Sequence, residues 1–283
     1  GTATPGAQIT VTTSWNGASY RTKADGAGCW NIYAKTPEAS YKAYSMTIKG
    51  DGETIRINDI LIGEVWFASG QSNMQMPMMG FYNCPVENAA EYISAPAAKE
   101  KIRMFNVPAI QSYEPLTEVE GEWKGAESET VPYMSATAYF FARELNEVMD
   151  IPVGIINCAY GGARIESWTP KEILETYPDE DLRRETIESM IHYHRPYLAY
   201  NAMLNPTKGY TIKGFIWYQG CSNTGKHEQF CERMTNMVNH WRECWGDKDA
   251  KLPFYMVELA PYRNKPQTAV PYFALLRQAQ HET

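Results

Sequence analysis

The stretch Glu64-Val65-Trp66-Phe67-Ala68-Ser69-Gly70-Gln71-Ser72-Asn73 decides the fold of this chain. Its first half is a short, mostly apolar run and its second half is small and polar, which is typical of a buried strand that ends in a loop. Ser72 follows the strand closely, so its hydroxyl is placed to face a cleft. Ser72 is therefore a candidate nucleophile, whereas a serine without this context usually closes a turn or caps a helix.

Two other apolar runs end in polar, glycine-containing loops. The run over residues 152–156 leads to Tyr160-Gly161-Gly162, and the run over 212–218 leads to Gln219-Gly220-Cys221-Ser222-Asn223. Ligands bind beyond the carboxyl ends of strands in parallel sheets. The three loops are therefore expected to converge on one site.

Helical patterns separate these strands. We predict helices at 138–149, 170–195, 227–245 and 271–280, and further strands at 102–107 and 254–259. Strands that alternate with helices predict an α/β domain of three layers, with a parallel sheet covered by helices on both faces. This domain is expected to span residues 61–283.

Residues 1–60 have a different pattern, because apolar residues alternate there as in half-buried strands. The alternating positions are Ile9, Val11 and Trp15; Trp30, Ile32 and Ala34; Tyr44, Met46 and Ile48; and Ile55 and Ile57. No helical pattern occurs in this part. We predict a small antiparallel, β-sandwich-like module, and the boundary near residue 60 is a change of period with no flexible linker.

Composition excludes several classes of protein. A net charge of −7 over 283 residues argues against a nucleic-acid partner. No run approaches the roughly 20 apolar residues of a membrane span. The six cysteines form no C-x-x-C pair, and no H-E-x-x-H, P-loop or G-x-G-x-x-G motif occurs. We therefore expect no metal and no organic cofactor, and the oligomeric state stays open.

The three loops contain groups suited to acyl transfer. The serine motif is not the G-x-S-x-G elbow, since Met74 stands where the second glycine would be. Gly161 and Gly162 would let backbone N–H groups approach a negative oxygen, and the side-chain amides of Gln219 and Asn223 are neutral donors of the same kind. The alternatives are a tight turn for the glycines and loop capping for the amides.

Together these segments resemble the sialate O-acetylesterases and related carbohydrate acetylesterases of the SGNH superfamily, whose hydrolase domain is flavodoxin-like. The matching segments are Gly63-Glu64-Val65-Trp66 with Gly70-Gln71-Ser72-Asn73-Met74; Tyr160-Gly161-Gly162 with Ile165-Glu166-Ser167-Trp168; Tyr200-Asn201-Ala202-Met203-Leu204-Asn205-Pro206 with Trp217-Tyr218-Gln219-Gly220; and Leu276-Arg277-Gln278-Ala279-Gln280. The resemblance covers nearly the whole chain, including the β-module.

The resemblance implies a role for each position. Ser72 would attack an acetyl carbonyl, and its own N–H, one glycine N–H and one side-chain amide would hold the oxyanion. Gly162 and Gln219 are favoured over Gly161 and Asn223. The substrate-binding candidates are Arg164, Glu166 and Trp168: Arg164 could pair with a sugar carboxylate, and Trp168 could stack on a sugar ring or simply pack.

The chain departs from the family in two places. Cys221 stands where the family usually has Glu after Gln-Gly. The family's Asp and His, in a D-x-x-H-like block, should follow residues 276–280, but the chain ends at Thr283. No histidine matches that position, so we expect a chain truncated before its catalytic base and also incomplete at its start.

The implied activity is removal of O-acetyl groups from carbohydrates, most of all sialic acids, through an acetyl-Ser72 intermediate. One alternative is an acetylxylan-type deacetylase on the same fold, and another is an esterase that prefers longer acyl groups. A third is a carbohydrate-binding relic without a base. Family analogy implies a secreted or periplasmic protein, although no signal peptide opens the chain.

Overall fold

The computed structural model describes residues 1–98, 101–262 and 270–283. The chain divides into two compact units. The first comprises Gly1–Glu64 and Met149–Pro152, and the second comprises Val65–Val148 and Val153–Thr283. The short segment Met149–Pro152 therefore lies with the first unit, which the change of period near residue 60 does not indicate.

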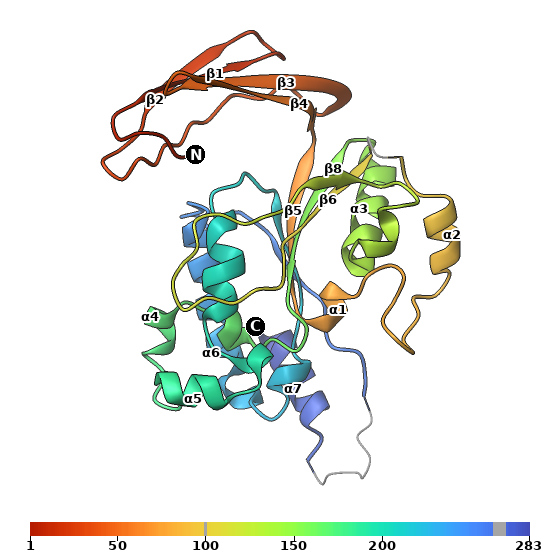
Figure 1. Ribbon diagram of the computed structural model, residues 1–283. Helices are drawn as coiled ribbons and strands as arrows, with labels where there is room; N and C mark the ends of the chain where they lie inside the picture. Colours follow the sequence, from red (N-terminus) through yellow and green to blue (C-terminus); the bar gives the residue numbers. More distant parts are fainter. Residues whose placement is uncertain (99–100, 263–269) are drawn as a thin grey trace. The chain divides into compact units, whose positions relative to one another are not determined.

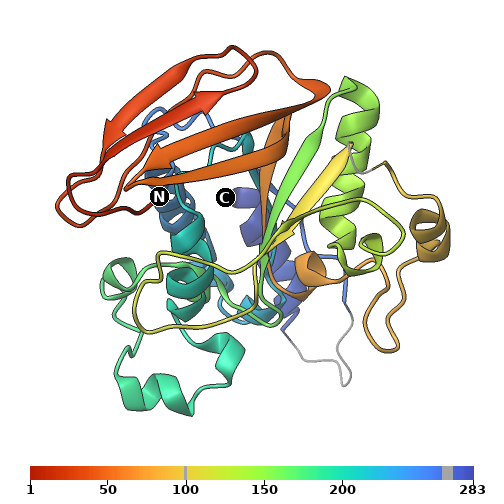
Figure 2. The same ribbon diagram turned by 45° about the horizontal axis from the view of Figure 1, so that its top comes forward.

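The first unit contains a four-stranded antiparallel sheet in the order β2-β1-β3-β4 (Figure 2). Its strands are β1 (Gln8–Thr13), β2 (Ser19–Lys23), β3 (Ser40–Gly50) and β4 (Glu53–Ile62). The β3–β4 hairpin turns at Asp51 and Gly52, whose φ angles are 49° and 75°. A two-residue turn with both φ angles positive matches the twist of antiparallel strands, and Asp-Gly is a preferred pair for it.

Two expectations for this unit are wrong. Residues 30–34 form no strand. Two hydrogen bonds from tryptophan side chains to the backbone hold this segment instead. Trp30 Nε1 donates to the Thr2 carbonyl at 3.3 Å, and Trp15 Nε1 donates to the Lys35 carbonyl at 2.8 Å. Ile55 and Ile57 on β4 are exposed, so their alternation marks no buried face.

The second unit is built on a six-stranded sheet in the order β10-β9-β5-β8-β6-β7 (Figure 1). Its strands are β5 (Glu64–Gly70), β6 (Ile102–Asn106), β7 (Trp123–Gly125), β8 (Val153–Ala159), β9 (Gly214–Tyr218) and β10 (Phe254–Met256). β10 and β5 pair with β9 in parallel, as β8 does with β6. The edge strand β7 is antiparallel to β6, which corrects the fully parallel sheet expected from the sequence.

Seven α-helices occur in the described residues: α1 (Ser72–Gln75), α2 (Ala89–Ser94), α3 (Ala136–Met149), α4 (Lys171–Leu174), α5 (Arg184–Ser189), α6 (His227–Cys244) and α7 (Tyr272–Glu282). The predicted helix over 170–195 is mostly wrong, because only α4, α5 and a 3₁₀ turn form there. Pro178 lies between α4 and α5, and a proline inside a helix removes a hydrogen bond and clashes with the preceding turn.

The six-stranded sheet buries both faces. Trp66 and Ala68 of β5 join a core with α3, whereas Phe67 between them joins a core with α6 and α7. β8 and β9 divide in the same way, since side chains alternate across a strand. Figure 1 shows α3 on one side of the sheet and α6 and α7 on the other. The predicted three-layer α/β arrangement is confirmed.

Candidate active site

The order of the strands brings the three polar loops together. β5 lies between β9 and β8, so the loop that carries Ser72 is flanked by the loops after those two strands. The ends of the strands are bonded directly: the Tyr160 N–H donates to the Gly70 carbonyl at 3.2 Å, and the Gln71 N–H donates to the Tyr218 carbonyl at 3.1 Å. The structure thus brings together the three segments singled out in the sequence.

Gly70 is required where β5 meets β9. Its φ is 140°, a conformation that L side chains rarely adopt, and a Cβ on it would lie 2.2 Å from the Tyr218 carbonyl oxygen. Any side chain here would push the two strands apart. The glycine before the nucleophile therefore serves a close approach of two backbones.

Ser72 is the first residue of the short helix α1 and is half-buried. Its Oγ has no hydrogen-bond partner among the described residues. Gly161 lies next to it, because a Cβ built on Gly161 would stand 3.9 Å from Ser72 Cβ. The Ser72 N–H precedes the first bonded turn of α1, so the helix does not use it. Ser72 thus lies next to the glycine loop, with a hydroxyl and a backbone N–H that have no partner among the described residues.

Two glutamines from the Ser72 segment hold the flanking loops, and sequence reasoning missed both. Gln71 Oε1 accepts from the N–H groups of Gly220, at 3.0 Å, and Ser222, at 3.3 Å. Gln75 Oε1 accepts from the Gly161 N–H at 2.8 Å. The only feature of the sequence that could have identified these two glutamines is their position on either side of Ser72. The sequence does not show which way the side chain of a loop residue points.

The two glycines after β8 differ in what they can offer. The Gly161 N–H is occupied by Gln75, whereas the Gly162 N–H has no partner among the described residues. Gly162 has a φ of 78°, and a Cβ on it would lie 2.4 Å from the ring of Tyr193. The packed ring and the positive φ both require glycine at this position. Of the two glycines, Gly162 is therefore the one whose N–H is left without a partner among the described residues.

The amide of Gln219 does not fit the oxyanion role expected for it. Gln219 is fully buried, and its Nε2 donates to the Ala163 carbonyl at 3.1 Å and to Asn223 Oδ1 at 2.6 Å. Both hydrogens of the amide are therefore used inside the protein. Its Oε1 has no partner among the described residues, and that atom is an acceptor, which cannot stabilise an anion.

Asn223 is fixed by three bonds. Its Oδ1 accepts from the Ile165 N–H at 3.1 Å and from Gln219, and its Nδ2 donates to Glu166 Oε2 at 3.0 Å. One hydrogen of Nδ2 is left over, because an amide nitrogen carries two. Asn223 thus joins the loop after β9 to the loop after β8 and keeps a spare donor.

Glu166 does not bind substrate as expected, because it belongs to a buried ionic network. Glu166 and Arg233 are each 2% exposed, and Arg233 Nη1 bonds Glu166 Oε1. Burial alone would raise the pKa of the Glu166 carboxyl, but the charges of Lys226 and Arg233 hold that pKa below its ordinary value. The carboxylate is thereby kept ionised as the acceptor for Asn223.

Arg233 continues the network away from the loops. Its Nη1 lies 2.5 Å from Glu180 Oε1, and its Nη2 lies 2.7 and 2.6 Å from the two oxygens of Asp179. Lys226 Nζ lies 3.2 Å from the same Glu180 oxygen. Buried charges are tolerated only when paired in this way. The network therefore fixes the position of the Glu166 carboxylate, which in turn holds the Asn223 side chain.

Trp168 does not stack on a sugar, because it is fully buried. Its ring makes edge-to-face contacts with Trp217 and Trp241, with centroids 6.4 and 6.5 Å away. Its carbonyl accepts from Trp241 Nε1 at 3.1 Å. The packing reading of Trp168 is the correct one.

Arg164 is half-buried at the edge of the site. Its Nε donates to the Ser222 carbonyl at 3.2 Å, so the side chain runs from the loop after β8 to the loop after β9. Burial lowers the pKa of His194, and the charge of Arg164 lowers it further. A guanidinium anchored in this way retains donors for an anionic ligand.

None of the five histidines hydrogen-bonds Ser72 within the described residues. His240 of α6 is bonded to Tyr200 Oη at 2.6 Å, and His192 and His194 flank Tyr193 in a 3₁₀ turn. His227 begins α6 and His281 lies on α7. These positions give no reason to assign the base to any of them.

The described residues meet neither the requirements of a metal site nor those of a membrane span. They contain no group of three or more His, Cys, Asp or Glu that could hold a metal ion, and no helix among them could cross a membrane. The six cysteines are unpaired. Cys221 is half-buried within the loop that Gln71 binds, between Gly220 and Ser222, and burial raises the pKa of its thiol.

Comparisons with known proteins identify the family of this chain. Residues 62–283 match the family described as carbohydrate esterase, sialic acid-specific acetylesterase. The chain is 28% identical to the sialate O-acetylesterases of Mus musculus and Homo sapiens, over 94% and 92% of its length but only 57% and 53% of theirs. A carbohydrate acetylesterase structure from Xanthomonas citri superposes with a TM-score of 0.86 at 31% identity, over 100% of this chain and 61% of that one.

The chain thus spans little more than half the length of the curated relatives it matches. The match of the family to residues 62–283 covers the whole six-stranded sheet and all three loops. The chain belongs to the sialic acid-specific acetylesterase family of carbohydrate esterases.

Proposed function

We propose that this chain carries the nucleophile of an esterase that removes O-acetyl groups from carbohydrates through an acetyl-Ser72 intermediate. The observation that supports this most is the position of Ser72, at the end of the strand between β9 and β8 and next to Gly161. Among the described residues, the Ser72 hydroxyl has no hydrogen-bond partner, and the N–H groups of Ser72 and Gly162 have none either. This is the arrangement that acyl transfer to serine needs.

In the proposed reaction, Ser72 Oγ attacks the acetyl carbonyl carbon and gives its proton to a general base. The N–H groups of Ser72 and Gly162 donate to the negative oxygen that forms. The sugar hydroxyl leaves with the proton, and acetate is released when water attacks the acetyl-enzyme. Losing one oxyanion donor typically costs roughly 10²–10³ in rate.

We assign the side-chain donor to Asn223 in place of Gln219. Both hydrogens of the Gln219 amide are bonded to protein acceptors, whereas Asn223 keeps one. Glu166 and Gln219 orient Asn223 so that this hydrogen has a fixed direction. The supporting network behind Glu166 then acts on the reaction through Asn223.

The general base in this proposal is a histidine oriented by an aspartate, as in other serine esterases. No histidine bonded to Ser72 occurs in the described residues, and the matching relatives are longer than this chain. The decisive assay therefore uses both these 283 residues and any longer form of the natural protein. If neither form hydrolyses acetyl esters, a carbohydrate-binding protein without catalysis is the better reading.

We propose O-acetylated sialic acid as the substrate, with Arg164 binding its carboxylate. Arg164 is anchored at the Ser222 carbonyl beside the loop of the spare Asn223 donor. An acetylated neutral polysaccharide such as xylan offers no carboxylate to this guanidinium. Acetate release from the two substrates, compared in wild type and Arg164→Gln, separates them, because only a carboxylate-bearing substrate should lose affinity.

The test of the nucleophile is the Ser72→Ala variant assayed with 4-nitrophenyl acetate. We expect its kcat to fall at least about 10³-fold, since the covalent route is lost. Ser69→Ala is a matched control, because that serine lies in β5 and bonds the Cys158 carbonyl at 2.6 Å. Equal rates for wild type and Ser72→Ala would remove Ser72 from the mechanism. Butyryl and octanoyl esters test the preference for short acyl groups.

By family analogy, the same proposal places the protein outside the cytoplasm, where acetylated glycans occur. Detection of the natural protein in a periplasmic or culture fraction checks this location.

A further inference from the structure

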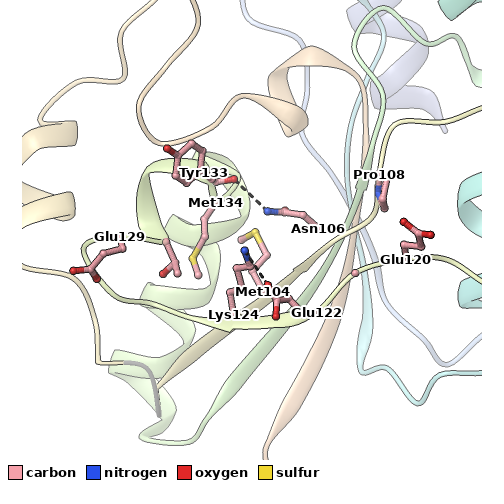
Figure 3. A pocket seen from close by; sticks show the side chains of 11 residues that line it. Met104, Asn106, Pro108, Glu120, Glu122, Lys124, Glu129, Tyr133 and Met134 are labelled. Carbon is pink, nitrogen blue, oxygen red and sulfur yellow. Dashed lines mark hydrogen bonds and ion pairs between the residues drawn. The ribbon is translucent and has the colours of Figure 1, made fainter.

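A pocket of about 460 Å³ opens beside β6 and β7 and has no role in the reaction described above (Figure 3). Small-molecule pockets usually measure about 300–1,000 Å³. Its lining includes residues of β6, of the chain that leads into β7 and of the 129–134 segment. All of these residues belong to the second unit.

One wall of the pocket is bonded to the chain that follows Ser72. The Met78 N–H donates to the Met134 carbonyl at 2.8 Å, and the Ala136 N–H donates to the Met76 carbonyl at 2.9 Å. Ser135 Oγ donates to the Met74 carbonyl at 2.6 Å. The wall that contains Met134 is therefore continuous with α1 and the nucleophile.

A second wall is bonded to the strand that leads to the glycine loop. Asn106, at the end of β6, accepts from Asn157 Nδ2 at 2.9 Å, and Asn157 lies on β8. Figure 3 shows the Asn106 side chain pointing toward Tyr133, whose carbonyl accepts from Asn106 Nδ2 at 3.2 Å. In the order of the strands, β6 follows β8 on the side away from β9, so the pocket lies at a strand two places from β5 and is joined to the site through β8 and the segment after Ser72.

The lining combines one exposed aromatic ring with charged side chains. Met104 and Met134 are buried, while Tyr133 is 66% exposed and offers its ring to solvent. At the rim, Lys124 Nζ lies 3.1 Å from Glu122 Oε1, and Glu129 adds another carboxylate. A pyranose has matching surfaces, with an apolar C–H face for an aromatic ring and hydroxyl edges for charged and amide groups.

The charge of the lining restricts the kind of sugar. The lining contains the carboxylates of Glu120, Glu122 and Glu129 against the single ammonium of Lys124. Like charges placed together oppose an anionic ligand. A ring that carries a carboxylate is therefore disfavoured here, in contrast to the edge of the site that carries Arg164.

We infer that this pocket is a subsite for a neutral sugar ring, the one next to the acetylated residue of a longer glycan. The inference rests on the proposed function, because it takes the acetylated residue to lie at Ser72. It adds that the preferred substrate is an oligosaccharide and that the neighbouring residue carries no carboxylate. Tyr133 is then a specificity-determining residue for this neighbour.

The kinetic test compares an acetylated oligosaccharide that has a neutral neighbouring ring with the acetylated monosaccharide. We expect Tyr133→Ala to lower the ratio of their kcat/KM values about five- to tenfold, through KM of the oligosaccharide. Tyr133→Phe should keep the wild-type ratio. The control is Tyr255→Ala, because Tyr255 is 55% exposed on β10, at the opposite edge of the sheet. An unchanged ratio in Tyr133→Ala, or an equal change in Tyr255→Ala, overturns the inference.

A binding test separates this inference from the proposed function. Saturation-transfer NMR with lactose as a neutral probe and glucuronic acid as an anionic probe needs no catalysis. We expect a lactose signal that is lost in Tyr133→Ala and a weaker signal from glucuronic acid. This result can hold even if Ser72→Ala shows that Ser72 is not the nucleophile. Absence of a Tyr133-dependent lactose signal contradicts the subsite, whatever the fate of Ser72.

Discussion

The two sheets of this molecule differ in how much of each is buried. In the six-stranded sheet, neighbouring residues of β5 such as Trp66 and Phe67 enter separate cores on the two faces. In the four-stranded sheet, Ile9 and Val11 of β1 are buried, but every residue from Glu53 to Asp59 on β4 is exposed. The doubly buried sheet is the one whose strand ends carry the candidate site. Tightly packed layers on both faces give those loops a rigid base.

The largest expected effect is a loss of stability when the buried charge network of the second unit is broken. Among the described residues, the first unit has no such network. Arg233→Met removes the partner of Glu166 and Glu180, so the free energy of unfolding should fall by about 3–5 kcal/mol. Urea denaturation measures it. The control is Arg183→Met, because Arg183 is exposed and pairs with Asp181 at the surface, so this variant should leave the midpoint unchanged. A loss in Arg233→Met no greater than in the control would contradict the role of the network.

The next effect concerns the glutamine that holds the glycine loop. Gln75→Leu removes the acceptor for the Gly161 N–H, and we expect kcat to fall roughly tenfold with little change in KM, as for a lost bond of about 1.4 kcal/mol. Gln75→Glu keeps an acceptor and should restore most of the rate. Initial rates with 4-nitrophenyl acetate measure both variants. If Gln75→Glu is as slow as Gln75→Leu, the hydrogen bond to the Gly161 N–H is not the cause of the lower rate.

The third effect is a dependence of stability on pH. The pKa of Glu166 is lowered in the folded protein from an ordinary value of 4.5. A carboxyl of this kind stabilises the fold above its unfolded pKa and loses that contribution as the pH falls through its folded pKa. Unfolding free energy should therefore be steady from pH 7 to about 5 and decrease below about 4.5. Denaturation of Glu166→Gln at the same pH values should show a shallower decrease, and an identical slope would contradict the assignment.

The smallest effect is expected for Ile57→Thr in the first unit, with Val11→Thr as the contrast. Ile57→Thr on β4 replaces an exposed side chain and should change stability by no more than about 0.5 kcal/mol. Val11→Thr on β1 buries a hydroxyl at a position that is 1% exposed and should cost more, about 1–3 kcal/mol. Thermal unfolding of both variants measures the difference. Equal costs would mean that the two strands are buried alike in solution.

Much of the second unit could be predicted from sequence, because long periodic patterns and strand-end loops depend on local residues. The strands over 102–106 and 214–218 and the helices α3, α6 and α7 follow from such patterns. Residues 30–34 could not be predicted in this way, since side-chain bonds to distant backbone decide their conformation. The segment 170–195 lacks a clear apolar stripe and contains Pro178.

The candidate site was predicted less completely than the fold. The sequence indicated Ser72 and the loops that carry the glycines and amides. It also predicted that Gln219 would contact the oxyanion and that Glu166 and Trp168 would bind substrate. These three residues are buried, and burial depends on packing between segments that are far apart in the chain. Gln71 and Gln75 were missed for the same reason. Which way an amide points is decided by its partners, and the residue type does not reveal it.

Gly70 has a consequence for how this family can change over time. Because a Cβ on it would stand 2.2 Å from the Tyr218 carbonyl oxygen, even alanine would force β5 and β9 apart. The atoms in the way belong to the backbone of Tyr218, so no change of side chain in β9 would relieve the clash. Position 70 should therefore be among the slowest parts of the chain to diverge.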